Sequence, residues 1–374
     1  MRWASQCLID NGILRATTID SVAKSIDELE AQTLAEMPPS LKELPRDEIP
    51  LLPFDMVGVK AFRALIGPIA DKSPATRVDR EDVVEYESED LPGLSRLIDE
   101  IAAGQRGLVM VMGKGGVGKT TVAAACAVGL VERGYRMHLS TTDPAAHLLM
   151  TLDGELPGLR VDRIDPKAET ESYIEKIMAT RGARLDEEGR ALLREDLRSP
   201  CTEEVAVFHA FSRIVSEARS AFVILDTAPT GHTLLLMDAT GAYHQQVMRD
   251  FGKRQLSGRV ITPLMRLQDQ TYTHVILVTL PETTPVSEAA ALQEDLRRAR
   301  IEPFAWVVNR SLLGSGTHEA LLVQRIASEK AQVRRVRETL AGKTFILPWQ
   351  SIPPVGIDTL KRLSAPITEN AAQP

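Results

Sequence analysis

The stretch from Gly113 to Thr121, Gly-Lys-Gly-Gly-Val-Gly-Lys-Thr-Thr, constrains the fold of this chain more than any other feature. It fits the phosphate-binding loop pattern G-x-x-x-x-G-K-[ST] and carries an additional lysine at its second position. The apolar run 107–112 before it predicts a buried strand, and the run 121–131 after it predicts a helix. Glycines let backbone N–H groups turn inward, and the helix N-terminus adds positive potential, so this context favours an anion cradle. We therefore predict a nucleotide-binding loop that contains the following residues: Gly113, Lys114, Gly115, Gly116, Val117, Gly118, Lys119, Thr120 and Thr121.

Two carboxylates follow predicted strands and complete a hydrolytic site. In P-loop chemistry Lys119 reaches the β- and γ-phosphates and the Thr120 hydroxyl holds Mg²⁺. Asp143 follows the predicted strand 137–141, where it can orient the attacking water or contact Mg²⁺ through water; the alternative is a helix N-cap. Asp226 ends the apolar run 222–226 and is predicted to support Mg²⁺, because a charge at the end of a buried strand is costly without a partner. The loop after Asp226 contains Pro229 and Gly231, which suit a segment that changes conformation when the γ-phosphate leaves.

Short apolar segments alternate with amphipathic ones throughout the region after residue 91. Strands are predicted at 107–112, 137–141, 222–226, 274–280, 305–309 and 344–347. Helices are predicted between them, at 171–178, 189–197, 205–218, 285–299 and 320–340. This alternation predicts an α/β fold with a doubly wound, mostly parallel sheet. Together with the loop, it predicts a P-loop NTPase of the class whose Walker A loop bears an extra lysine.

Composition excludes several other classes of protein. The chain has 374 residues and a net charge of −7, which argues against a nucleic-acid surface as its main feature. Its apolar runs are shorter than the roughly 18 residues that a membrane span requires, and its N-terminus lacks the apolar core of a signal peptide. We therefore expect a soluble, cytoplasmic protein. Three widely spaced cysteines make neither a disulfide framework nor a zinc knuckle.

The segment before the P-loop domain repeats part of it. The stretch 49–65 can be laid on 347–363, with Pro50/Pro348, Val57/Val355, Gly58/Gly356 and Leu65/Leu363 all at one offset of 298 positions. We therefore predict that residues 1–70 are the last strands and helices of an upstream homologous half, in the order strand, helix, strand, helix; chance similarity of strand ends is the alternative. Residues 71–91 are charged, with 11 charged side chains between 71 and 90, and predict a linker. The P-loop ATPase domain is then 92–366, followed by a tail at 367–374.

Three motifs together resemble the arsenical pump-driving ATPases, which are related to the ATPases that deliver tail-anchored membrane proteins. They are the lysine-bearing loop, Thr142-Asp-Pro-Ala-Ala-His147 and Asp226-Thr-Ala-Pro-Thr-Gly-His-Thr233, and the stretch 196–204 strengthens the match. The resemblance covers roughly 92–365 and implies an ATPase that uses ATP and Mg²⁺ and is activated by As(III) or Sb(III). It also implies a membrane efflux pump subunit as partner, with the ATPase peripheral at the inner face of the membrane. A homodimer or a separate homologous first half is expected, an arsenite-delivering metallochaperone is possible as a further partner, and no nucleic acid is expected.

The resemblance also implies roles for residues outside the loop pattern. Lys114 is expected to reach across a pseudo-symmetric interface to the nucleotide held by the facing half; a solvated surface lysine is the alternative. Base recognition falls on Asn309 and on the loop 348–356 that begins at Pro348. This loop departs from the family pattern at the base contact, because it has Pro353-Pro354 where the family typically has Glu-Pro.

The metalloid site is expected around one cysteine. Arsenite and antimonite are soft and thiophilic, so thiolate ligands suit them. By resemblance, Cys201, Ser199 and His232 are this half's share of the metalloid ligands, with Cys201 in a turn between two helices. The alternatives are a buried cysteine and a purely structural histidine, and Cys126 is expected to pack in the helix after the loop.

Other functions of the same loop class remain alternatives. A carrier of tail-anchored proteins needs a large apolar groove, and the stretch 241–269 is short and carries five basic residues. A partition or division ATPase needs a basic face or a membrane-binding helix, which the C-terminal sequence does not provide. A nitrogenase-type iron protein needs paired cysteines, and only Cys201 is suitably placed.

Overall fold

The structure, a computed structural model, describes residues 8–14, 20–66, 92–143, 148–227 and 261–365. Its centre is a sheet of seven strands in the order β5-β4-β6-β3-β7-β8-β9, and every neighbouring pair is parallel. The strands are β3 (Gly107–Met112), β4 (Met137–Thr141), β5 (Leu159–Arg163), β6 (Phe222–Asp226), β7 (Thr273–Thr279), β8 (Ala305–Ser311) and β9 (Thr344–Pro348). The predicted doubly wound α/β fold is therefore confirmed.

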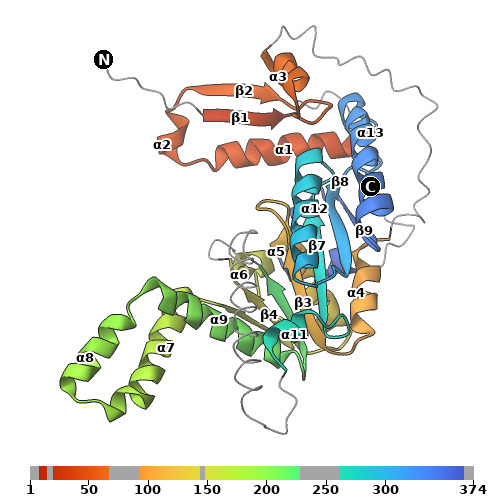
Figure 1. Cartoon of the computed structure of the whole chain (residues 1–374). Helices are drawn as coiled ribbons and strands as arrows, with labels where there is room; N and C mark the ends of the chain where they lie inside the picture. The colour runs from red at the N-terminus through yellow and green to blue at the C-terminus, as the bar shows by residue number, and fades with distance from the viewer. Residues whose placement is uncertain (1–7, 15–19, 67–91, 144–147, 228–260, 366–374) are drawn as a thin grey trace, which may run out of the picture.

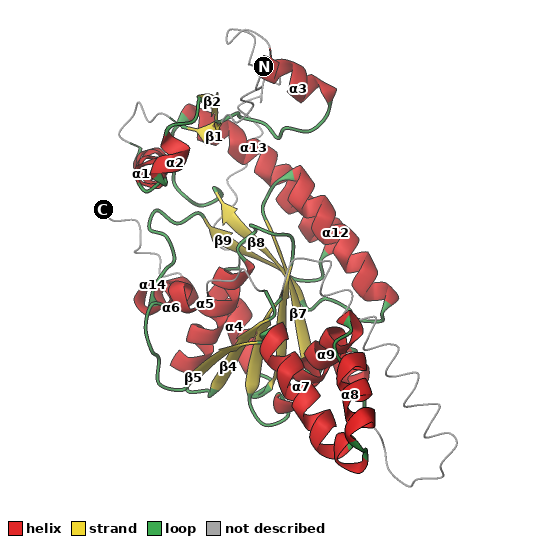
Figure 2. Ribbon diagram, turned by 90° about the vertical axis from the view of Figure 1, so that its left-hand side faces the viewer, coloured by secondary structure: helices red, strands yellow, loops and turns green. Residues whose placement is uncertain are grey.

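Helices cover both faces of this sheet (Figures 1 and 2). The helices packed on one face are α4 (Leu94–Ala102), α5 (Lys119–Glu132), α6 (Leu148–Leu152) and α14 (Ile357–Ser364). The helices packed on the other face are α9 (Pro200–Glu217), α11 (Pro263–Leu267), α12 (Thr283–Arg298) and α13 (Ala320–Arg335). Strand residues alternate between the two cores: Val109 and Val111 of β3 belong to the first, and Leu108 and Met110 to the second. This alternation follows from the period of two along a strand.

A helical protrusion extends from the sheet between β5 and β6. It contains α7 (Pro166–Thr180), a 3-10 turn (Gly182–Arg184), α8 (Glu187–Asp196) and the first part of α9 (Figure 1). The Asp165 side chain caps α7, and the Asp186 side chain caps α8, each by accepting backbone N–H groups of the first turn. Because α8 buries none of its residues, packing fixes it less firmly than the helices on the sheet.

The N-terminal segment forms a second, smaller sheet beside α13. Its elements are β1 (Leu8–Ile13), α1 (Ser21–Ala35), α2 (Pro39–Lys42), β2 (Arg46–Pro50) and α3 (Val59–Ile66), and β1 pairs with β2 in parallel. Figure 1 shows this segment at the upper end of the molecule, close to the end of α13. We name residues 8–66 the N-terminal unit.

The N-terminal unit repeats the geometry of the C-terminal end of the chain at the offset of 298 positions. Leu8 pairs with Arg46 as Trp306 pairs with Thr344, and both strand pairs shift register at the same place, between Asn11 and Ile13 and between Asn309 and Ser311. The residue inside each irregularity has a positive φ, 95° at Gly12 and 55° at Arg310. The bond from Leu51 N–H to Ile13 O recurs from Trp349 N–H to Ser311 O, and α3 and α14 start at equivalent residues. We name the region 305–364 the C-terminal unit.

The two units meet through equivalent side chains. A buried cluster joins Leu14 to Leu312, its counterpart, and includes Val22, Ala23 and Leu322, with Leu51 and Trp349 packed against it. Such reciprocal contacts are those of a two-fold interface. Asp20 departs from the symmetry because its carboxylate accepts hydrogen bonds at the starts of both α1 and α13. Its Oδ1 accepts Ala23 N–H at 2.8 Å, and its Oδ2 accepts His318 N–H at 2.6 Å and the Thr317 hydroxyl at 3.0 Å.

Most predicted elements lie where they were expected. The predictions for β3, β4 and β6 match the observed bounds, whereas β8 is longer than expected by two residues and β9 by one. The helix predicted over 320–340 changes to a π-helical turn at Val336–Leu340. Strand β5 was not predicted, because this edge strand carries charged residues in alternation and resembles a loop in sequence. The division into an upstream remnant, linker and ATPase domain stays a prediction; the linker and tail lie outside the described residues.

Candidate functional site

The phosphate-binding loop lies at the carboxyl end of β3, and α5 begins at Lys119. Two of its glycines are required by close contacts. A Cβ on Gly113 would lie 2.4 Å from the Val278 carbonyl oxygen, and a Cβ on Gly118 would lie 2.1 Å from the Asn309 side-chain nitrogen. Gly118 also has a φ of 94°, which favours glycine. The loop therefore packs against the carboxyl ends of β7 and β8, and the N-terminus of α5 lies at the same end of the sheet.

Lys119 is buried in the curve of this loop. Its ammonium group donates to the Lys114 carbonyl oxygen at 3.2 Å. Burial lowers the pKa of Lys119, and the nearby carboxylates of Asp226 and Asp143 oppose that shift. A cation held inside the loop by its backbone is in position to interact with phosphate oxygens.

Thr120 and Asp226 come together at the same end of the sheet. The Thr120 hydroxyl donates to Asp226 Oδ2 at 2.8 Å, and the Thr141 hydroxyl lies 3.4 Å from the same oxygen. Asp226 is fully buried, and this burial raises its pKa to about 6, against the opposing effects of Thr120 and Lys119. Among the described residues, Asp226 Oδ1 has no hydrogen-bond partner. A hydroxyl beside a buried carboxylate with an unused oxygen fits Mg²⁺, which prefers oxygen ligands.

Asp143 approaches the same carboxylate from β4. The backbone N–H of Thr142 donates to the Asp226 carbonyl oxygen at 3.0 Å, and Asp143 N–H donates to the Thr141 hydroxyl at 3.1 Å. The charge of Asp143 acts on both Lys119 and Asp226. The structure thus brings Lys119, Thr120, Asp226 and Asp143 together, although they come from three separate parts of the sequence.

Lys114 forms an ion pair with Glu288 in this structure. Its ammonium group lies 2.5 Å from Glu288 Oε1 on α12, and both side chains are a little under half exposed. Sequence reasoning missed Glu288 and the Thr141 hydroxyl. The threonine could have been found from its place at the end of a strand beside the Asp226 strand. Nothing in the sequence signals Glu288, because its contact depends on α12 lying next to the loop.

The residues predicted to recognise the base lie at the ends of β8 and β9. Asn309 is buried, and its side-chain N–H donates to the Val117 carbonyl oxygen of the loop at 2.8 Å. Its side-chain oxygen accepts the backbone N–H of Arg310 at 2.9 Å. Asn309 therefore supports the phosphate-binding loop here. Pro348 ends β9, and base recognition by Asn309 and Pro348 stays a prediction.

The predicted metalloid ligands lie away from the loop in sequence and only partly within the described residues. Cys201 is exposed and belongs to the first turn of α9, rather than to a turn between helices, because Pro200 at the first helical position favours that start. The Ser199 hydroxyl lies 3.3 Å from that of Thr202. His232 lies outside the described residues. Within the ranges that the structure describes, no group of three or more His, Cys, Asp or Glu side chains could hold a metal ion. Burial raises the pKa of Cys126 to about 12, which suits its predicted packing role.

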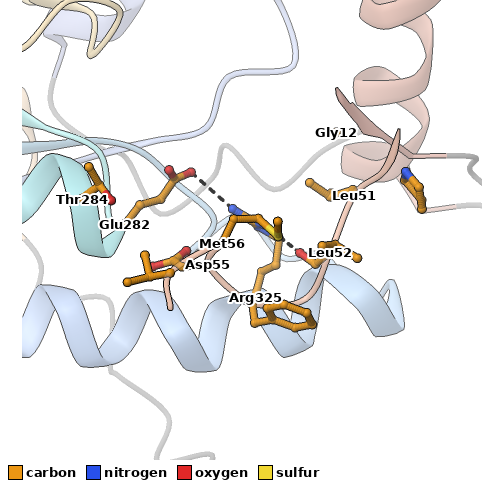
Figure 3. A pocket seen from close by; sticks show the side chains of 11 residues that line it. Gly12, Leu51, Leu52, Asp55, Met56, Glu282, Thr284 and Arg325 are labelled. Atoms are coloured by element: carbon orange, nitrogen blue, oxygen red, sulfur yellow. Dashed lines mark hydrogen bonds and ion pairs between the residues drawn. The ribbon is translucent and has the colours of Figure 1, made fainter. Parts of the chain in front are cut away.

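A separate cavity of about 290 Å³ lies between the N-terminal unit and α12 and α13. The stretch from Pro50 to Val57 forms one wall, and Glu282, Thr284 and Arg325 form the other (Figure 3). The Arg325 guanidinium donates to the Leu52 carbonyl oxygen at 2.8 Å and pairs with Glu282 at 3.3 Å. These contacts join the N-terminal unit to the P-loop domain.

Comparison with known proteins relates the chain to one family. The model of the anion-transporting ATPase family matches residues 106–268. An arsenical pump-driving ATPase of Escherichia coli is 49% identical over 362 residues, which are 96% of this chain and 61% of that protein. One of Acidiphilium multivorum is 49% identical over 361 residues, again 96% of this chain and 60% of that protein. A putative arsenical pump-driving ATPase of Halobacterium salinarum is 30% identical over 287 residues, 71% of this chain and 42% of the relative.

The chain therefore spans about three fifths of the length of the two bacterial relatives. None of the helices in the described ranges is long and apolar enough to cross a membrane.

Proposed function

We propose that this chain, which is similar to members of the anion-transporting ATPase family, hydrolyses ATP to drive the export of arsenite and antimonite through a membrane partner. One observation carries the proposal: the Thr120 hydroxyl and the Asp226 carboxylate meet at 2.8 Å beside Lys119, at the carboxyl end of a parallel sheet. Parallel α/β sheets bind their ligands at this end. The transported class is proposed from two of the relatives described above, which are arsenical pump-driving ATPases.

The roles of the residues follow from their places. The backbone N–H groups of the loop and the N-terminus of α5 bind the β- and γ-phosphates, and Lys119 supplies a charge to the same oxygens. Thr120 and Asp226 would hold Mg²⁺, directly or through water, and the bound ion would neutralise developing charge on the phosphates. Asp143 orients the attacking water. Most of the catalysis is thus positioning and electrostatic stabilisation.

The role proposed for Lys114 requires a second protein unit that docks opposite the phosphate-binding loop. We propose that Lys114 leaves Glu288 when a second copy of this chain or a separate homologous first half docks, and then contacts the nucleotide across the interface. The unit repeat supports such an arrangement, because the N-terminal unit already meets the C-terminal unit through equivalent residues. Residues 1–70 are accordingly proposed to be the end of an upstream homologous half, and 92–366 the ATPase domain.

The remaining assignments rest on the resemblance to the arsenical pumps. Cys201, Ser199 and His232 are proposed to bind As(III) or Sb(III), with further ligands from the second copy of the chain or the separate first half that docks opposite. Asn309 and the loop that begins at Pro348 are proposed to recognise the base. The protein is proposed to be cytoplasmic and peripheral at the inner face of the membrane when bound to its efflux partner, and an arsenite-delivering metallochaperone is a further possible partner.

The catalytic assignment is tested with Asp143→Asn in the full chain. Because Asp143 acts on the transition state, kcat should fall by about 100-fold while the Kd for ADP stays within about two-fold. Steady-state hydrolysis of ATP with Mg²⁺, and calorimetric titration with ADP, measure the two quantities. Unchanged turnover would show that Asp143 is not part of the hydrolytic site.

The metalloid assignment is tested separately by stimulation with antimonite. Cys201→Ser should retain basal hydrolysis and lose the stimulation, since a hydroxyl binds a soft ion more weakly than the thiolate it replaces. Cys126→Ala is the matched control, because it removes a thiol that is buried in α5. Stimulation that survives in Cys201→Ser would place the metalloid elsewhere and favour the carrier of tail-anchored proteins.

A further inference from the structure

A buried carboxylate lies behind the end of β8, outside the hydrolytic site. Glu329 on α13 is 6% exposed. Its Oε2 accepts two hydrogen bonds, from the Ser311 hydroxyl at 3.0 Å and from the backbone N–H of Leu312 at 2.8 Å. Ser311 in turn accepts Leu313 N–H at 3.2 Å, so three consecutive residues after the strand are tied to this one carboxylate.

These residues follow directly on the contact that supports the phosphate-binding loop. The β8–β9 register shifts between Asn309 and Ser311, and Arg310 between them has a φ of 55°, in the left-handed region. Asn309 donates to the Val117 carbonyl oxygen of the loop at 2.8 Å. A turn that is strained for a side-chain-bearing residue persists only where its surroundings hold it. Glu329 is the buried group that bonds to the far end of this turn.

We propose that Glu329 is a positioning residue for nucleotide binding: it holds the turn 309–312 so that Asn309 keeps the phosphate-binding loop in its binding conformation. The inference rests on the proposed function, since it concerns the same nucleotide site. Glu329 contacts neither the phosphates nor Mg²⁺ and acts through Ser311, Leu312 and Asn309.

The N-terminal unit offers an internal comparison. At the same place in its strand pair, Gly12 stands in the position of Arg310 and Ile13 in that of Ser311. Glycine adopts a φ of 95° there without a side-chain clash, and isoleucine has no hydroxyl to donate. The C-terminal unit has instead an arginine in the unfavourable conformation and a serine bonded to a buried carboxylate. The carboxylate is thus found in the unit whose turn contacts a phosphate-binding loop.

The charge of Glu329 sets the strength of its hydrogen bonds to Ser311 and Leu312. Burial raises the pKa of Glu329 to about 7, while the bonds from Leu312 and Ser311 and the charge of Arg325 oppose that shift. Glu282, at the start of α12, raises it further, and Asp55 of the N-terminal unit acts in turn on Glu282. The ionised form is the stronger acceptor for both donors. Nucleotide binding should therefore strengthen as the pH rises through about 7.

The test is a calorimetric titration of the full chain with ADP and Mg²⁺ between pH 6 and pH 8.5, in wild type, Glu329→Gln and Glu338→Gln. The matched control, Glu338, is an exposed glutamate near the end of the same helical segment. Between pH 8 and pH 6, wild-type affinity should weaken about 5-fold more than that of Glu329→Gln, which should bind weakly at every pH. Asp226 titrates in all three proteins, so the difference between variants is the quantity that reports on Glu329. Glu338→Gln should follow wild type.

A second variant keeps the test decisive if Glu329→Gln fails to fold. Ser311→Ala removes one of the two donors and leaves the charge, so affinity at pH 8 should fall about 2- to 3-fold. Wild-type affinity and pH profile in Glu329→Gln, or in Ser311→Ala if that is the variant measured, would overturn the inference and leave the proposed function intact. A wild-type chain that binds no ADP at any pH would overturn both.

Discussion

The N-terminal unit and the C-terminal unit have the same backbone geometry but different surroundings. In the C-terminal unit, α14 packs on α5 and Leu360 is fully buried. In the N-terminal unit, the equivalent residue of α3 is Phe62, and it is 55% exposed. The strand register, its irregularity and the helix start are nevertheless the same in both. The same backbone geometry therefore forms with and without a P-loop helix beside it, and contact with α5 decides whether this residue of the last helix is buried.

The largest expected effect comes from truncating these two equivalent side chains. Leu360→Ala should reduce the free energy of unfolding by about 2–5 kcal/mol, because it leaves a cavity against α5. Phe62→Ala should reduce it by less than about 1 kcal/mol, since the side chain is half exposed. Urea denaturation of the two variants gives both values. Equal losses would show that the N-terminal unit is covered by a partner in solution and would break the comparison.

The next largest effect is expected at Asp226, the buried carboxylate at the nucleotide site of the P-loop domain. The folded-state pKa of Asp226 is raised to about 6 by burial, so in the nucleotide-free protein this carboxyl group stays protonated to a higher pH than an exposed aspartate. Its contribution to stability is therefore fully present below the ordinary aspartate pKa of 3.8 and is lost as the pH rises through about 6. Asp226→Asn should stabilise the nucleotide-free chain at pH 8 by about 1–3 kcal/mol, with little change at pH 4. Thermal unfolding at the two pH values checks this, and equal shifts at both would contradict it.

A smaller effect is expected where the symmetry of the two units fails. Asp20 caps α1 and also accepts N–H groups at the start of α13, whereas His318 stands at its equivalent position and is exposed. Asp20→Ala should cost about 1–2 kcal/mol, and His318→Ala less than about 0.5 kcal/mol. The hydrogen bonds to Asp20 lower its pKa against the opposing effect of burial. Its contribution should thus be present above the ordinary aspartate pKa and disappear as the pH falls through the lowered value. Similar losses in the two variants would show that the cap is not shared.

The smallest effect on stability is expected at Glu288. Helix α12 begins where Asp55 of the N-terminal unit accepts Thr283 N–H at 2.8 Å, and it carries Glu288 to Lys114. Because both partners of the Lys114 pair are exposed to solvent, Glu288→Gln should change the free energy of unfolding by less than about 0.5 kcal/mol. Acylation of Lys114, followed by mass spectrometry, should nevertheless become about 2-fold faster. An unchanged rate would show that Glu288 does not hold Lys114 in solution.

Sequence patterns predicted the central site better than its surroundings. The apolar strands and the glycine loop are local features, so β3, α5, Asp226 and Asp143 could be predicted to meet at one edge of the sheet. Glu288 and Glu329 could not, because their contacts require α12 and α13 to lie beside β7 and β8. Strand β5 was missed because its alternating charged residues hide an edge strand. The repeat of 298 positions was visible in a few identities, but the shared register and positive φ are properties of the backbone alone.

The central claim is that the loop 113–121 and the two strand-end carboxylates form the nucleotide site of this chain, and that the N-terminal unit forms none by itself. Calorimetric titration of Lys119→Ala with ADP and Mg²⁺, beside wild type, tests it most directly. The account predicts one ADP per chain for wild type and an affinity at least about 100-fold weaker for Lys119→Ala. Phe62→Ala, in the N-terminal unit, should bind as wild type does. Affinity like that of wild type in Lys119→Ala, or two nucleotides per wild-type chain, would contradict the account.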